Sequence, residues 1–250
     1  MSAYDAVAAL PFVDTLRHLA VVDSTNTFAR ALRPPAGAGI AVVVADRQIA
    51  GRGQRGNAFF SSTEDGLWVS LIVPLGELAG HFTVNRALTL ALCETVAAAG
   101  CGNAAAIKWP NDILCSSRKI CGILLETHAV SPAHIVAGFG LNVNTEPRTF
   151  PDTLRPAATS LFIETGRTHA LGPLLESVLT RFKRLRSLDA DQAHGLYTGR
   201  LAGLGAPARI GGTAGVFAGV LPDGRAEILT PDGPNYFFSG PLRFSMEEAR

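Results

Sequence analysis

Lysine is scarce in this sequence, which has three lysines against 19 arginines among its 250 residues. Two of the three, Lys108 and Lys119, lie in one short stretch, whereas Lys183 lies in a basic run typical of a solvated helix face. An ammonium group is a compact point charge, and a guanidinium group is a planar fork. Retention of lysine in this stretch therefore points to a site that needs a compact cation. Chance also explains so small a number, so other motifs must support this interpretation.

Long apolar runs, excess charge of one sign and a basic leader are also lacking. Glycine, proline or charged residues interrupt every apolar run before the ~18 residues of a membrane span, so no membrane segment is expected. The net charge is +1 and the basic residues are scattered, which argues against a surface for nucleic acid. The first residues, Met-Ser-Ala-Tyr-Asp, do not resemble a signal peptide. We expect a cytoplasmic protein.

Cysteine is also sparse, and no two cysteines form a Cys-x-x-Cys pair. This spacing argues against a zinc site or a disulfide framework. We interpret all four as buried thiols of a cytoplasmic protein: Cys93, Cys101, Cys115 and Cys121.

Hydrophobic residues make up 47% of the chain and charged residues 17%, enough apolar material for a substantial core. Apolar periodicity predicts two kinds of element. The expected helices are near 3–20 (followed by a short strand), 25–32, 82–99, 159–165 and 172–188. The expected strands are 39–45, 67–73, 107–109, 112–115, 120–128 and 134–143. Short turns between the later strands imply an α+β fold with a mixed, largely antiparallel sheet.

The composition changes after about residue 200. Five short strands are expected between residues 208 and 245, separated by Gly-Gly and Pro-Asp-Gly turns. Such a pattern suits a small β-barrel packed on the main domain. We therefore predict two domains, residues 1–200 and residues 201–250.

The glycine-rich segment Gly51-Arg52-Gly53-Gln54-Arg55-Gly56 matches the spacing G-x-G-x-x-G. A dinucleotide-binding fingerprint needs a strand that turns directly into a helix, and the polar residues that follow here do not favour a helix. An anion-binding loop fits better, because glycine leaves backbone N–H groups accessible and Arg52 and Arg55 add charge. A mobile surface loop is the alternative.

A second glycine pattern occurs in the strand expected at 134–143. Gly138 and Gly140 share one face of this strand, and Asn142 continues that face. Paired glycines in a strand usually mark the close approach of a ligand or of another backbone; a bulge or a helix crossing is the alternative. Together the polar groups are cations, backbone amides and carboxamides, which suits phosphoryl or nucleotidyl transfer rather than nucleophilic or metal-cluster chemistry.

Seven stretches of the chain together resemble the biotin–protein ligases, or biotin–[acetyl-CoA-carboxylase] ligases. They follow the family's order and spacing over about residues 20–165: D-S-T-N (23–26), Q-x-A-G-R-G-x-R-G-N (48–57), G-L-W-x-S (66–70), K-W-P-N-D-I (108–113), R-K-x-x-G-I-L-x-E (118–126), G-x-G-x-N-V-N (138–144) and A-T-S-L (158–161). The resemblance implies a C-terminal barrel of the Src-homology-3 type.

The resemblance also implies a two-step reaction. The carboxylate of biotin attacks the α-phosphate of Mg-ATP, and the resulting biotinyl-5′-adenylate then donates biotin to a lysine of a biotin carboxyl carrier protein. The first step brings two anions together, so cations must lie between them. Lys119, Arg52 and Arg55 are the catalytic candidates.

By position in the family motifs, further residues would bind the two substrates. Biotin would be held by Ser24, Thr25, Asn26, Gln48, Gly51, Arg52, Lys119, Gly138 and Gly140, with Trp68 or Trp109 as an apolar wall. ATP and the adenylate would contact Arg52, Gly53, Gln54, Lys108, Asn111, Lys119 and Asn142. Asp112 is the one candidate for a Mg²⁺ ligand or for assisting the incoming lysine. The loop Thr145–Pro156 would close over the adenylate.

Departures and alternatives accompany the resemblance. The family often has arginine where Gln54 stands and tryptophan where Phe59 stands. Gln54 keeps a hydrogen-bonding group but lacks the charge, so weaker retention of the adenylate is expected unless Arg52 and Arg55 compensate. No winged helix-turn-helix fits before residue 23, so DNA binding is not expected.

A lipoate–protein ligase is the nearest alternative, but its R-R-x-x-G-G-G loop is missing. A biotin-sensing module without catalysis is another, although it would not need phosphate-binding cations. A homodimer is compatible with the resemblance.

Overall fold

The computed structural model describes residues 3–75, 80–151 and 158–244. Its main element is a seven-stranded sheet with the order β1-β2-β3-β7-β6-β5-β4. The strands are β1 (Val13–Val22), β2 (Ile40–Gln48), β3 (Gly66–Pro74), β4 (Ala105–Lys108), β5 (Asp112–Cys115), β6 (Arg118–Thr127) and β7 (His134–Asn142). β1 and β2 pair in parallel, and each of the other neighbours pairs antiparallel. The predicted mixed, largely antiparallel sheet is confirmed.

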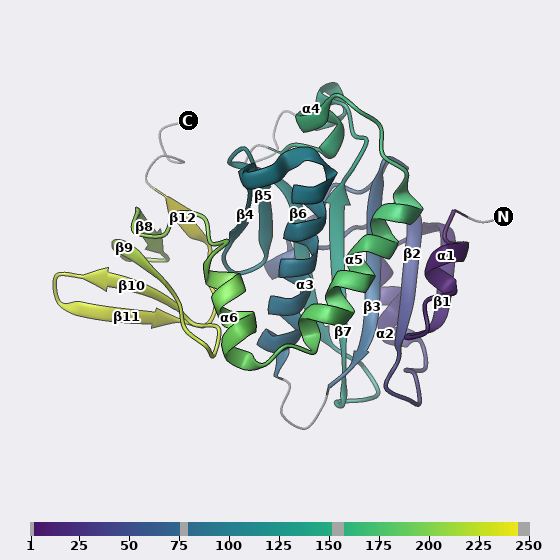
Figure 1. Ribbon diagram of the computed structural model, residues 1–250, viewed down its shortest axis with the longest axis horizontal. Helices are drawn as coiled ribbons and strands as arrows, with labels where there is room; N and C mark the ends of the chain where they lie inside the picture. The colour runs from purple at the N-terminus through teal and green to yellow at the C-terminus, as the bar shows by residue number, and fades with distance from the viewer. Residues whose placement is uncertain (1–2, 76–79, 152–157, 245–250) are drawn as a thin grey trace.

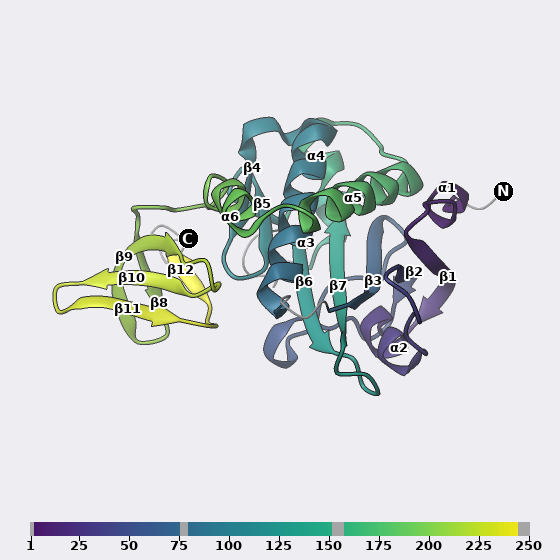
Figure 2. The ribbon, with the colours of Figure 1, turned by 60° about the horizontal axis from the view of Figure 1, so that its bottom comes forward.

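Helices cover the two faces of this sheet unequally. α3 (His81–Val96) and α5 (Leu171–Arg186) pack side by side on one face, as Figure 1 shows. α2 (Thr25–Ala31) lies on the opposite face against β2, β3 and β7 (Figure 2). The shorter helices are α1 (Asp5–Ala8), α4 (Leu161–Thr165) and α6 (Ala190–Thr198). One face therefore carries most of the helical cover.

The strands alternate in character between the two faces. On β3, Leu67, Val69 and Leu71 are buried in the large core beneath α3 and α5. The intervening Trp68 and Ser70 lie on the α2 face, opposite Gly140 and Gly138 of β7. We call this second side, with its small and polar residues, the glycine face. Next to it, α2 builds a minor core from Ala29, Ala41, Val43, Ile72 and Val136.

The C-terminal strands form a separate antiparallel sheet with the order β11-β10-β9-β8-β12. They are β8 (Pro207–Ile210), β9 (Thr213–Val220), β10 (Ala226–Thr230), β11 (Gly233–Phe237) and β12 (Leu242–Phe244). This small sheet lies beside α6, at the β4 end of the large sheet (Figure 1). Before it begins, Arg200 and Ala202 still exchange backbone hydrogen bonds with Ile107 of β4, at 2.7 and 2.8 Å. The division at residue 200 stays a prediction.

Three expectations from the sequence are wrong in detail. A ten-residue strand, β1, occupies much of the segment expected to be mainly helical, and α1 is only a single turn. α6 was not predicted, although its Asp189 cap accepts a hydrogen bond from Gln192 N at 2.8 Å. Cys101 and Cys115 form a disulfide, so only Cys93 and Cys121 are free thiols. The fold brings the paired cysteines together from the end of the short helical segment Ala97–Cys101, which follows α3, and from the end of β5.

The helical stretch His81–Ala104, which includes α3, is long and apolar enough by length and composition to cross a membrane. Of its most apolar window, 56% is buried inside the folded chain. Val84, Leu88 and Leu92 are fully buried in the large core. The core therefore accounts for the apolar composition of this helix.

Candidate functional site

The first turn of α2 and the end of β2 form a buried polar cluster at one end of the glycine face. The Thr25 amide donates to Gln48 Oε1 at 2.8 Å, and the Thr25 hydroxyl lies 3.1 Å from the same oxygen. Because a backbone N–H can only donate, the side-chain oxygen of Gln48 must face Thr25. Its NH₂ group is then directed toward Gly51, where it can donate to a ligand carbonyl. Ser24, Thr25 and Gln48 are all buried, as a preorganised subsite requires.

Asn26 lies behind this cluster with its amide group fully engaged. Its Nδ2 atom donates to Glu126 Oε2 at 2.9 Å and to Leu124 O at 3.3 Å. Its Oδ1 atom accepts from Ser70 Oγ at 2.6 Å. Asn26 is only 4% exposed, so it supports the subsite from behind. The prediction that it contacts biotin is not tested, and its NH₂ group is already used within the protein.

Glycines leave a shallow floor in the middle of the sheet. A Cβ atom on Gly138 would clash with the Asn26 amide, and one on Gly140 would clash with the ring of Phe59. A Cβ atom on Gly122 of β6 would lie 3.0 Å from Phe59 and 3.1 Å from Lys119 Nζ. Trp68 borders this floor, with its ring edge-on to Phe59 and its Nε1 atom donating to Thr63 O at 2.8 Å. The Asn26 amide and the Phe59 ring therefore approach the strand closely at the two glycines, Gly138 and Gly140.

The glycine-rich segment folds back on itself over this floor. Phe59 N donates to Gly51 O at 2.9 Å, Gly53 N donates to Asn57 O at 2.8 Å, and Arg52 bridges to Ala58. Only one 3₁₀ turn, Gln54–Gly56, lies within it. No helix follows the glycines, so the dinucleotide-binding alternative is excluded. The Arg52 side chain is half exposed, with its NH1 atom 3.9 Å from Glu126 Oε1. The Arg55 side chain lies outside what the structure describes.

Lys119 lies at the other end of the floor. Its Nζ atom is 2.7 Å from Asp112 Oδ1 and 5.8 Å from the centroid of the Phe59 ring. The nearby Cys121 thiol is buried, and burial raises its pKa well above the usual range, which keeps the sulfur protonated. Lys119 is therefore a partly exposed cation beside a neutral thiol. Its partner is the Asp112 carboxylate, which the carboxylate or phosphate of a ligand can replace.

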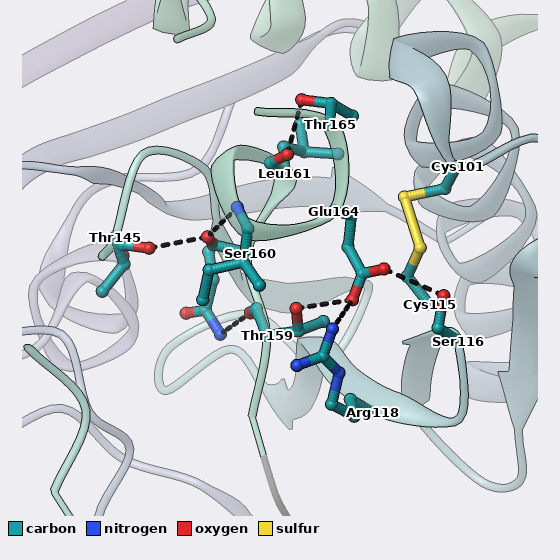
Figure 3. Close-up of polar contacts among 12 residues, drawn as sticks. Cys101, Cys115, Ser116, Arg118, Thr145, Thr159, Ser160, Leu161, Glu164 and Thr165 are labelled. Carbon is teal, nitrogen blue, oxygen red and sulfur yellow. Dashed lines mark hydrogen bonds and ion pairs between the residues drawn. A yellow bond between two sulfur atoms is a disulfide. The ribbon is translucent and has the colours of Figure 1, made fainter. Parts of the chain in front are cut away.

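A partly buried hydrogen-bond network fixes the backbone around Lys119. Glu164 accepts from Ser116 Oγ at 2.9 Å, from Arg118 NH2 at 2.8 Å and from Thr159 Oγ1 at 2.6 Å, as Figure 3 shows. Thr159 N donates to Lys119 O at 2.8 Å, and Thr159 O accepts from Asn142 Nδ2 at 2.9 Å. The role of Glu164 was not predicted, because its partners Ser116 and Arg118 lie 48 and 46 residues away along the chain. The network ties the start of β6 to the residues that follow the predicted closing loop.

The structure also places several predicted residues away from the glycine floor. Lys108 Nζ lies 5.7 Å from the centroid of the Phe244 ring, at the junction with the small C-terminal sheet. Trp109 Nε1 donates to Gly224 O at 3.0 Å, so Trp109 supports that sheet. Of the two tryptophans expected as a wall or support for biotin, Trp68 is the one that borders the glycine floor, and its contact with biotin stays a prediction. Asn111 Nδ2 donates to Ile123 O and locks the turn before β5. Contacts of Lys108 and Asn111 with ATP stay predictions.

The predicted closing loop, Thr145–Pro156, is described only up to residue 151. Within the described part, Phe150 packs against Phe60 of the glycine-rich segment, with ring centroids 5.8 Å apart. Ser160, which follows the loop, donates to Thr145 O at 2.6 Å and caps α4 by accepting from Ile163 N. The two loops that border the floor therefore touch each other through one pair of aromatic rings.

Comparison with known proteins shows the family of this chain. The model of the biotin/lipoate A/B protein ligase family matches residues 18–142. A biotin–[acetyl-CoA-carboxylase] ligase of Paracoccus denitrificans is 33% identical over 231 residues, which cover 86% of this chain and 94% of that protein. The bifunctional ligase/repressor BirA of Bacillus subtilis is 36% identical over 150 residues, 57% of this chain. That match spans only 45% of the length of the Bacillus protein.

The solved structures include a biotin protein ligase from Aquifex aeolicus in complex with biotin and ATP. It superposes with a TM-score of 0.76 at 29% identity, covering 93% of this chain and 100% of that one. The shared fold includes the small C-terminal sheet, since the alignment spans nearly the whole chain. With the family match over residues 18–142, this shows that the chain belongs to the biotin/lipoate A/B protein ligase family.

Proposed function

We propose that this chain is an ATP-dependent biotin–protein ligase. The observation that carries the proposal is the arrangement along the glycine face. A buried polar cluster at Thr25 and Gln48, a glycine floor, and the Lys119 cation follow one another. Biotin has a polar ureido head, a flat ring system and a terminal carboxylate, which correspond to these three parts in order. The named biotin–[acetyl-CoA-carboxylase] ligase among the relatives supports biotin over lipoate.

The first step joins two anions, the carboxylate of biotin and the α-phosphate of ATP. The carboxylate oxygen bonds to the α-phosphorus, and pyrophosphate leaves with the electrons of the broken P–O bond. Lys119 exchanges Asp112 for these anions and neutralises charge that builds up between them, and Arg52 approaches from the glycine-rich loop. Gln48 and Thr25 hold the ureido head in position, which contributes orientation.

In the second step, the neutral amine of a carrier lysine attacks the acyl carbon of the adenylate. An amide bond forms, the bond from the acyl carbon to the phosphate oxygen breaks, and AMP leaves. Asp112, released by Lys119, lies close enough to the site to accept the proton that the amine loses. The carrier is a biotin carboxyl carrier protein in this proposal. A homodimer and a cytoplasmic location stay predictions, and the Cys101–Cys115 disulfide is unusual for a reducing compartment.

A magnesium ion accompanying ATP fits the residues present. Among the described residues, no three His, Cys, Asp or Glu side chains gather as a metal site. Mg²⁺ usually binds to substrate phosphates with one or two protein carboxylates, and Asp112 can supply one. When bound, the ion neutralises phosphate charge. This part of the proposal predicts that Asp112→Asn raises the Mg²⁺ concentration needed for half-maximal rate.

The proposal is tested by pyrophosphate release with biotin, ATP and a purified carrier domain. We expect release that depends on biotin, and biotin on the carrier lysine by intact-mass spectrometry. The same assay with lipoate in place of biotin tests the alternative substrate, and we expect no release. A chain that binds biotin without releasing pyrophosphate would instead be a sensing module.

A further inference from the structure

The Glu126 carboxylate is the junction of three segments that meet on the glycine face. Glu126 lies on β6, and its side chain is 18% exposed. Its oxygens accept from Asn26 Nδ2 at 2.9 Å and from Arg30 NH1 at 3.1 Å, and Arg52 NH1 lies 3.9 Å away. Two of these residues belong to α2, and the third belongs to the glycine-rich loop. One partly buried anion therefore holds both elements against the sheet.

A continuous chain of hydrogen bonds leads from Glu126 to the buried polar cluster. Asn26 Oδ1 accepts from Ser70 Oγ at 2.6 Å, and Ser70 Oγ lies 2.8 Å from Thr25 Oγ1. The backbone amide of Thr25 in turn donates to Gln48 Oε1 at 2.8 Å. Every member between Glu126 and Gln48 is at most 4% exposed. Water therefore cannot replace a lost member of the chain without a large change in packing.

Glu126 is the charged acceptor at the start of this chain. A carboxylate and a carbonyl only accept, so the NH₂ group of Asn26 faces both Glu126 and Leu124 O, and its oxygen faces Ser70. The one hydroxyl proton of Ser70 then goes to Asn26, and the Thr25 hydroxyl is left to donate to Ser70. Loss of the Glu126 carboxylate would leave the NH₂ group of Asn26 with Leu124 O alone. The carboxylate thus stabilises the position of Asn26, and through Ser70 that of Thr25.

We propose that Glu126 is a positioning residue for biotin, acting through Asn26 and Ser70 on the Thr25–Gln48 subsite. This inference rests on the proposed function. It assigns Glu126 to the recognition of biotin rather than of ATP, because the chain of hydrogen bonds ends at Gln48 and does not reach Lys119. Arg52 lies 3.9 Å from the same carboxylate with half of its side chain exposed, so this contact is weak.

The test compares three variants in the biotin-dependent pyrophosphate assay: Glu126→Ala, Glu126→Gln and Arg30→Gln. Hydrogen bonds to charged groups are stronger than those between neutral groups, so Glu126→Ala should raise the KM for biotin by ~10-fold or more, with the KM for ATP changed less than about twofold. Glu126→Gln keeps an acceptor but loses the charge, and its KM for biotin should lie between wild type and Glu126→Ala. Arg30→Gln removes one ion pair of the carboxylate at a partly exposed arginine and should raise the KM for biotin less than Glu126→Ala does.

An unchanged KM for biotin in Glu126→Gln and Glu126→Ala overturns the inference. Equal rises in the KM values for biotin and ATP overturn it as well, because they indicate a general loss of structure. Thermal unfolding of each variant shows whether it is folded, and the isosteric Glu126→Gln decides alone if Glu126→Ala does not fold. Wild-type protein in the same assay separates the two proposals. Inactive wild type contradicts the proposed function, whereas active wild type with unaffected variants contradicts only the role of Glu126.

Discussion

The two faces of the large sheet use the same strands in opposite ways. Toward α3 and α5, β3 and β7 present Leu67, Leu71 and Phe139, which interlock as a conventional core. Toward α2, the neighbouring positions are Ser70, Gly138 and Gly140, too small to fill space by themselves. Successive side chains of a strand point to opposite faces, so one stretch of sequence specifies both surfaces independently. We therefore expect the core face to control stability and the glycine face to control activity.

The largest effect is expected from removing the cation at the end of the glycine face. Lys119→Ala should lower the rate of biotin-dependent pyrophosphate release by about 10²–10³-fold, the usual result of losing one group that stabilises developing charge. The unfolding temperature should change little, because Lys119 is partly exposed. Lys183→Ala is the matched control, since this exposed lysine of α5 should have no effect on either quantity. Near-normal turnover in Lys119→Ala would refute its role.

Neighbouring residues on β3 allow a direct comparison of the two faces. Leu71→Ala empties a fully buried core position and should lower the free energy of unfolding by about 2–5 kcal/mol, with the KM for biotin unchanged. Ser70→Ala breaks the hydrogen bond to Asn26 and should cost about 1–3 kcal/mol, but with a raised KM for biotin. Urea unfolding and steady-state kinetics measure the two properties. A raised KM for biotin in Leu71→Ala would contradict the expectation that the core face controls stability and the glycine face controls activity.

The disulfide belongs to the core side, since Cys101 and Cys115 are both part of the large core. Their separation of 14 residues predicts a loss of about 3 kcal/mol in unfolding free energy on reduction. Dithiothreitol should therefore lower the unfolding temperature and leave the KM for biotin unchanged. The double variant Cys101→Ala/Cys115→Ala serves as control, because its unfolding temperature should not respond to dithiothreitol.

The smallest effect concerns the glycine floor itself. Gly140→Ala places a methyl group against the ring of Phe59 and narrows the space for a ligand, so the affinity for biotin should fall by ~10-fold, or about 1.4 kcal/mol. Gly195→Ala in α6 meets open space and should instead stabilise the helix by up to about 1 kcal/mol without changing affinity. Calorimetric titration with biotin measures the first effect, and thermal unfolding measures the second.

Much of the large sheet could be predicted because its signals are local. Alternating apolar residues and short turns located the strands from β2 to β7, and the seven motifs indicated the family that the relatives confirm. The signal for α6 was also local, an Asp189 followed by Gln192 at the capping distance, but Gly195 weakened the apparent helix. β1 is largely exposed and pairs in parallel with β2, so its pattern resembled an amphipathic segment.

The remaining features depend on contacts between distant segments. The pairing of Cys101 with Cys115 needs α3 to end beside β5, which no spacing within the chain reveals. The partners of Glu126 lie 74 to 100 residues away on the glycine-rich loop and on α2, so only the folded chain shows their convergence. The orientation of the Trp109 side chain depends on the position of the small C-terminal sheet, whose Gly224 accepts its hydrogen bond. Residue identity specified the chemistry, and tertiary structure decided which groups meet.

The contact between Trp109 and Gly224 has a practical consequence for dissecting this protein. The K-W-P-N-D stretch contributes to both parts of the molecule: Asp112 pairs with Lys119 on the glycine face, and Trp109 donates to the C-terminal sheet. A truncated chain without residues 201–250 would leave a buried indole uncovered and deprive its N–H of an acceptor. The C-terminal sheet is thus not an interchangeable module. Chimaeras that graft it from another member of the family need a matching acceptor opposite the indole.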